Sequence, residues 1–132
     1  MKRLTLAAAL ATAAGCATEP PRLEENVTYL AEWVGDEAVI GRRPLSLTLS
    51  EGRAYGNTGC NHWFAQYTLN GQALRFDAVG STRRACDAEL AEQERHFLAL
   101  LGEVRRWDVS QIDQLQLWPA EGAPLRFWPA QD

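Results

Sequence analysis

The sequence predicts an α+β domain that is mainly β: a small curved antiparallel β-sheet or β-barrel-like domain of about 7–8 short strands with one packed amphipathic α-helix. Apolar and polar residues alternate over several short segments separated by turn residues, which is typical of half-buried strands. The period changes once, after Cys86, to the spacing of an amphipathic helix. A length of 132 residues, 46% of them apolar and 23% charged, fits one globular domain.

The alternation predicts three strands before the clearest hairpin. Tyr29 to Val34 and Ala38 to Ile40 are the two weaker ones. Leu45 to Ser50 places leucines on one face and hydroxyl side chains on the other. Glu51-Gly52 then offers a turn into Arg53-Ala54-Tyr55.

Trp63 to Ala78 is expected to form one hairpin, because Asn70-Gly71 at its middle is a strong turn signal in which both residues tolerate positive φ. The larger and more apolar set on its first strand should face the core: Trp63, Ala65, Tyr67 and Leu69. The set expected to face outward is His62, Phe64, Gln66 and Thr68.

One helix of about four turns is expected after Cys86. Asp87 can cap its first free N–H groups, and Gly102 is predicted to end it in the left-handed conformation. Its apolar positions are Leu90, Phe97, Leu98 and Leu101. Three further strands are expected at Val104 to Val109, Gln114 to Trp118 and Leu125 to Trp128.

The chain contains five tryptophans, which we interpret as core and barrel-end residues. They are Trp33, Trp63, Trp107, Trp118 and Trp128. The alternative is that one or two of them stack on a ligand.

The first sixteen residues have the layout of a bacterial secretion signal, with Lys2 and Arg3 before a short apolar run and small residues before Cys16. This indicates a signal peptide over 1–15, a lipidated Cys16 with a tether over 16–26, and one domain over 27–132. Ordinary cleavage that leaves no lipid is the alternative.

The expected location is the cell envelope, with the protein lipid-anchored and facing the periplasm. Ala17 is not the aspartate that resembles an inner-membrane retention signal, which favours the outer membrane. The 13 Lys and Arg against 17 Asp and Glu give a net charge of −4, which argues against nucleic-acid binding. The protein is expected to be monomeric.

Cys60 and Cys86 remain if Cys16 carries a lipid, and an even pair in an oxidising compartment predicts a disulfide. Free or redox-active thiols are one alternative. A zinc site is another, and its ligands would be Cys60, His62, Cys86 and His96. No metal or cofactor is expected.

Two blocks of residues resemble the signature of the META domain, or HslJ-like, family. The first runs from Gly56 to Asn61, including Gly59 and Cys60, with Tyr67 seven residues after the cysteine. The second runs from Thr82 to Cys86 and includes Arg83 and Ala85. The segments Glu92-Gln93-Glu94 and Phe97-Leu98 resemble the helix that follows in the family, and Ala65 stands where a glycine is usual.

The resemblance implies a barrel-like domain with a packed helix, often exported and lipid-anchored, whose two cysteines are commonly paired. It brings no catalytic residue. The signature can be explained structurally: Gly56 and Gly59 give backbone freedom at a bend, and Asn61 bonds loop backbone groups. Thr82 and Arg83 would lie beside the same bend.

No enzyme is expected from these residues. A nucleophilic pair of Cys60 and His62 competes with the disulfide for the same sulfur. The helix carboxylates Glu89, Glu92 and Glu94 are interpreted as a solvated face. The basic pairs Arg83-Arg84 and Arg105-Arg106 are interpreted as solvated turn residues, with contact to an acidic lipid or the cell wall as the alternative.

The leading hypothesis is a non-enzymatic, lipid-anchored module of envelope stress or maintenance. It would bind an unknown envelope protein or a small amphipathic ligand, with His62 and Phe64 as the partner surface. The alternatives are an inhibitor of cell-wall hydrolases, similar to lysozyme inhibitors, and a lipocalin-like carrier.

Overall fold

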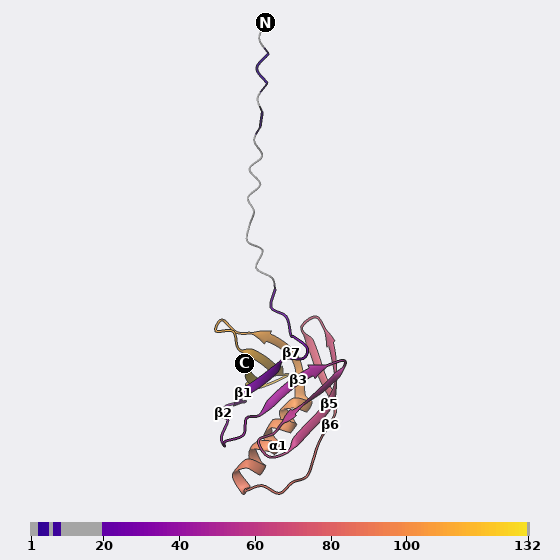
Figure 1. The fold of residues 1–132 in the computed structure, drawn as a ribbon, viewed down its shortest axis with the longest axis vertical. Coiled ribbons are helices and arrows are strands. Elements are labelled where there is room, and N and C mark those ends of the chain that lie inside the picture. Colours follow the sequence, from indigo (N-terminus) through magenta and orange to yellow (C-terminus); the bar gives the residue numbers. More distant parts are fainter. Residues whose placement is uncertain (1–2, 6, 9–19, 132) are drawn as a thin grey trace.

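The computed structural model describes residues 3–5, 7–8 and 20–131. Cys16 and most of the predicted signal peptide lie outside the described residues. In the described part, nine strands and one helix form a single body (Figure 1). The strands are β1 (Thr28–Val34), β2 (Glu37–Ala38), β3 (Ser46–Ser50), β4 (Arg53–Asn57), β5 (His62–Asn70), β6 (Ala73–Ser81), β7 (Val104–Val109), β8 (Leu115–Pro119) and β9 (Leu125–Pro129), and the helix is α1 (Ala88–Glu103).

The strands form one antiparallel sheet in the order β2-β1-β3-β4-β5-β6-β7-β8-β9. An additional pairing between β1 and β9 closes eight of them into a barrel, and the two-residue β2 extends β1 outside it. Strands β6 and β7 share one residue pair, Ala73 with Arg106, and α1 lies between them in the chain. The predicted fold class is confirmed.

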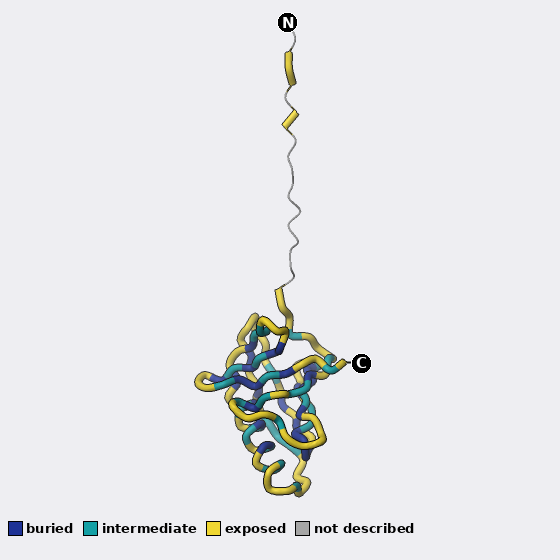
Figure 2. The backbone as a smooth tube through the Cα atoms, turned by 90° about the vertical axis from the view of Figure 1, so that its left-hand side faces the viewer, coloured by how far each residue is buried: buried dark blue, intermediate teal, exposed yellow. Residues whose placement is uncertain are grey.

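Buried residues recur along the strands of the barrel (Figure 2), and their side chains fill its interior. Buried and exposed residues alternate along the first halves of β5 and β6, as the period of two predicted, whereas Leu47, Thr48 and Leu49 of β3 are all buried. Trp63 lies at the centre of the core and packs edge-to-face on Phe76 and Phe97, with ring centroids 6.3 and 5.9 Å away. The other large, fully buried side chains include Phe127, Leu45, Leu47, Leu49, Leu74, Leu101, Leu117 and Leu125.

The helix begins as predicted, because Asp87 Oδ1 accepts a hydrogen bond from the Leu90 N–H at 3.1 Å. The prediction that Gly102 ends it in the left-handed conformation is wrong, since the helix continues to Glu103. Val104 is buried and extended, and its N–H donates to the Leu101 carbonyl. The chain therefore passes from helix to strand without a left-handed residue.

The β5–β6 hairpin turns at Asn70-Gly71 as predicted, but Leu69 does not face the core. Its side chain is 41% exposed because the hairpin tip extends beyond the packed interior. A bulge also interrupts the pairing, since Phe64 pairs with Gly80 and Gln66 with Asp77.

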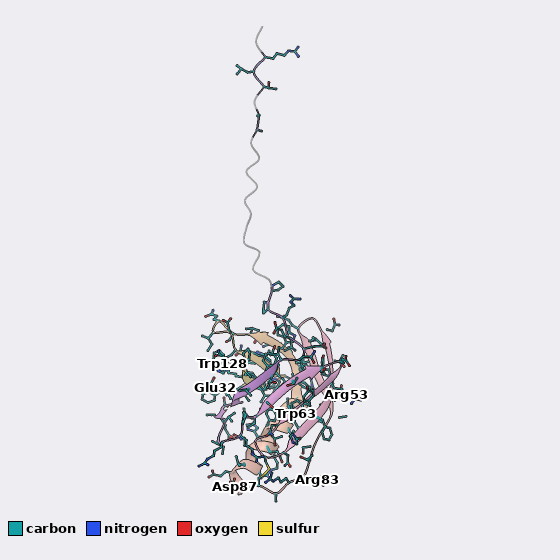
Figure 3. All side chains as sticks on the ribbon, in the orientation of Figure 1. Glu32, Arg53, Trp63, Arg83, Asp87 and Trp128 are labelled. Atoms are coloured by element: carbon teal, nitrogen blue, oxygen red, sulfur yellow. A yellow bond between two sulfur atoms is a disulfide. The ribbon has the colours of Figure 1, made fainter. Side chains whose placement is uncertain are left out.

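The five tryptophans were expected in the core and at the barrel ends, and the second of the two weaker strands was expected at Ala38 to Ile40. Trp63 and Trp107 are buried, Trp33 and Trp118 are half-buried, and Trp128 is exposed at one edge (Figure 3). The strand predicted at Ala38 to Ile40 is confined to Glu37–Ala38, because the chain then turns toward α1, where Gln93 binds the Ile40 backbone.

The described part of the predicted tether packs on the barrel. Leu23 packs against the core, the Glu24 N–H donates to the Tyr29 hydroxyl, and the Tyr67 hydroxyl donates to Glu25. Arg83 and Asp87 lie at the lower end of the barrel in Figure 3, whereas the described N-terminal segment joins the barrel at its upper end (Figure 1). Among the described residues, no helix is both long and apolar enough to cross a membrane.

Candidate functional site

The first signature block forms the loop between β4 and β5. Gly59 has φ +88°, in the left-handed region, which uses the backbone freedom expected at this bend. The Asn57 side chain accepts from the Gly59 N–H at 2.7 Å, and the Thr58 N–H donates to the Asn61 carbonyl at 2.8 Å. The loop is therefore closed by its own hydrogen bonds.

Gly56 serves a different purpose from the one expected, because its φ is not positive. A Cβ at this position would lie 2.0 Å from the Ser46 carbonyl oxygen and 2.8 Å from Trp63 Nε1. That carbonyl accepts the Trp63 indole N–H at 2.8 Å. The glycine thus leaves space for the hydrogen bond that anchors the central core tryptophan.

Asn61 is 4% exposed and ties three segments together. Its Oδ1 accepts from the Arg84 N–H at 2.6 Å and from the Thr82 hydroxyl at 3.1 Å. Its Nδ2 donates to the Arg84 carbonyl at 3.2 Å and to Glu94 Oε2 at 2.9 Å. The expected bonding of loop backbone is confirmed, and the bond to the helix is an addition that the sequence did not reveal.

Glu94 is half-buried, so its interpretation as a solvated residue is wrong. Its carboxylate accepts from the Thr58 hydroxyl as well as from Asn61, and Thr58 is fully buried. Glu89 and Glu92 are exposed, as expected. The reason for the difference is that Glu94 lies on the face of α1 that packs on the signature loop.

Cys60 and Cys86 form a disulfide with their Cα atoms 6.2 Å apart, which confirms that prediction. Because both sulfurs are in the bond, neither is a thiolate that could attack a substrate or bind zinc. His62 is exposed on β5, and His96 Nδ1 lies 3.7 Å from Glu37 on β2. The described residues contain no group of three or more metal-ligating side chains.

The second signature block lies beside the first, as expected. The Thr82 hydroxyl accepts from the His62 N–H at 3.1 Å, whereas the side chains of Arg83 and Ala85 are exposed. Tyr67 is half-buried near the other end of β5. The signature therefore does not form one chemical site.

Phe64 faces outward with 52% of its surface exposed, as its position in the alternation predicted. It pairs across the sheet with Tyr55, which is 48% exposed. On its other side, Phe64 covers Gly80, where a Cβ would lie 2.7 Å from the ring. We call Tyr55 and Phe64 the aromatic pair. Sequence reasoning missed Tyr55, although its alternation with the inward Ala54 could have revealed it.

A family model described as "META domain" matches residues 21–132. Two solved structures share the fold. One is an NMR structure of a protein from Burkholderia xenovorans, with 25% identity, a TM-score of 0.67, and coverage of 82% of this chain and 84% of that one. The other is an NMR structure with 22% identity, a TM-score of 0.63, and coverage of 78% and 88%. No curated protein matches the sequence significantly.

Proposed function

The chain belongs to the META domain family, and from that premise we propose that it is a non-catalytic binding module of the bacterial cell envelope. Lipid on Cys16 would hold it at the outer membrane, facing the periplasm. Its role would be in envelope stress or maintenance, through binding an envelope protein or a small amphipathic ligand. The polar side chains of the signature hydrogen-bond one another and the loop backbone, which supports a structural role for them and leaves binding to other surfaces of the barrel.

The filled interior favours binding on the outside of the barrel over carriage inside it. Trp63, Phe97 and Phe127 are each exposed by 1% or less and occupy the space that a lipocalin-like carrier would keep for its ligand. Leucines from β3, β6 and β8 fill the rest.

The observation that carries the proposal is the aromatic pair. Tyr55 and Phe64 lie opposite each other on β4 and β5, which pair along the whole length of β4. The backbone that carries them is therefore already ordered before a partner binds. Aromatic side chains on a rigid sheet give a large contact area at little entropic cost. Arg53, Gln66 and Ala78 border a shallow cleft of about 370 Å³ beside Phe64, which could receive a partner side chain.

Photo-crosslinking in cells tests the proposal. A photoreactive amino acid at position 64 should give a discrete adduct, and Tyr55→Ala should reduce its yield several-fold. Ile112 is 64% exposed in a distant turn, so the same probe at position 112 is the matched control. Adducts of equal yield at both positions, or no effect of Tyr55→Ala, would contradict the proposed surface. An adduct with lysozyme would favour the hydrolase-inhibitor alternative.

Anchoring is tested separately by Cys16→Ser. The variant should leave the membrane fraction, while the parent chain should carry acyl mass on Cys16. Identical fractionation of the two chains, without acyl mass, would show that the lipid assignment is wrong.

A further inference from the structure

A second surface feature is a cleft of about 520 Å³ beside the disulfide. Its lining includes Asp87, which lies at the lower end of the barrel in Figure 3. Its apolar lining comes from Ile40, Ala85, Leu90 and the Cys60–Cys86 bridge. Its charged lining comes chiefly from arginines of two separate segments, Arg42-Arg43 and Arg84.

Buried amides hold both of these segments in place. Gln93, 7% exposed on α1, accepts from the Ile40 N–H at 2.7 Å and donates to the Ile40 carbonyl at 3.2 Å. Asn61 binds the N–H and carbonyl of Arg84 in the same two-bonded manner. The disulfide fixes the floor between them. The cleft is thus preorganised, and a ligand would not have to order its walls.

The arginines of the cleft are available for a ligand. Across the described residues, no hydrogen bond or ion pair involves the side chains of Arg42, Arg43, Arg84 or the neighbouring Arg83. In contrast, Arg95 pairs with Glu92, and Arg106 pairs with Asp108. Two carboxylates, Asp87 and Glu89, also line the cleft, so its three arginines leave it with a formal net charge of +1. The cleft is therefore a local cationic site on a protein of net charge −4.

We propose that this cleft binds a phosphomonoester attached to a small apolar group. A carboxylate offers two oxygens to one guanidinium, whereas a phosphomonoester offers three oxygens and a charge of about −1.5 to −2 at pH 7. Three unpaired guanidinium groups from two segments therefore match a phosphomonoester better than a carboxylate. Ile40, which is 43% exposed, and Leu90 provide a surface for the apolar part. The site is separate from the aromatic pair and does not depend on the proposed function.

Titration of the oxidised Cys16→Ser chain with phenyl phosphate, followed by calorimetry and by amide NMR shifts, tests the proposal. Binding should be saturable, with the largest shifts around Gly41 and Ala85. Inorganic phosphate should bind at least threefold more weakly, because it lacks the ring, and benzoate should be weaker still. Arg43→Gln with Arg84→Gln should raise the Kd at least tenfold. The matched double change Arg75→Gln with Arg105→Gln, at exposed arginines elsewhere, should change it less than twofold.

Several outcomes would overturn the inference. Absence of saturable binding, shifts confined to another face, or equal loss in both double variants would each exclude this cleft as an anion site. Equal affinities for phenyl phosphate and inorganic phosphate would exclude the apolar part of the assignment. Equal affinities for phenyl phosphate and benzoate would exclude the phosphomonoester.

Discussion

Replacing Gly56 by alanine should destabilise the barrel more than a glycine-to-alanine substitution at any of its other glycines. The added Cβ would lie 2.0 Å from the Ser46 carbonyl oxygen, which belongs to the backbone of β3 and cannot rotate away. Relief requires β3 and β4 to separate locally, and this would break the Trp63 indole bond to the same carbonyl.

The magnitude follows from two contributions. Overpacking of a tight site costs about 1–3 kcal/mol, and a buried donor left without its partner costs about 1–3 kcal/mol more. Trp63 is 1% exposed, so water cannot replace the lost acceptor. Gly56→Ala should therefore lower the free energy of unfolding by about 2–6 kcal/mol.

Two other glycines give matched controls for the same chemical change. Gly52 has φ +80° and open space around it, so alanine there should cost about 1–2 kcal/mol from backbone strain alone. Gly102 lies inside α1 with nothing near its Cβ position, so alanine there should stabilise by about 0.5–1 kcal/mol.

Urea unfolding, followed by tryptophan fluorescence and circular dichroism, measures the free energy of unfolding of the three glycine variants relative to the parent chain. The reasoning about crowding would be refuted if Gly56→Ala cost no more than Gly52→Ala. A destabilising Gly102→Ala would instead show that this glycine ends the helix after all.

Three further predictions concern stability. Cys60→Ser with Cys86→Ser should lower the free energy of unfolding by about 3.5 kcal/mol, the chain-entropy value for a separation of 26 residues; a midpoint unchanged by the substitutions or by reductant would contradict this. Burial raises the pKa of the Tyr29 hydroxyl, so the folded state retains its proton longer and stability should fall as pH rises above about 10; a flat alkaline profile of the melting temperature would speak against it. Ala78 sits in the β6 bulge with φ 54°, so Ala78→Gly should be neutral or stabilising by up to about 1 kcal/mol, and a clear loss in urea unfolding would show that its methyl group matters more than the strain.

The strand pattern was predictable because one side of each strand faces a filled interior. A period of two places Leu47, Ala54 and Phe76 inward on three different strands, and the turn at Asn70-Gly71 sets the register of the hairpin. Sequence reasoning also placed Phe64 outward correctly. These are local properties, which alternation and turn chemistry determine over a few residues.

The errors come from contacts between distant segments. Alternation assigned Leu69 to the core, but periodicity does not show where the barrel interior ends along a strand. The helix wheel assigned Glu94 to solvent, but Thr58 and Asn61 from a loop more than thirty residues away bind its carboxylate. Closure of β9 on β1 likewise depends on a pairing across almost the whole domain.

The structural role of the signature residue Asn61 also affects the surface of the barrel. Asn61 satisfies buried polar groups by binding the backbone of Arg84, and in doing so it fixes where that arginine leaves the barrel. Gln93 does the same for the segment that carries Arg42 and Arg43. A buried amide with two bonded partners tolerates little movement, because each broken bond leaves an unsatisfied group in the interior. Residues that do not line the proposed site themselves can therefore determine its shape, which links the family signature to the binding that we propose.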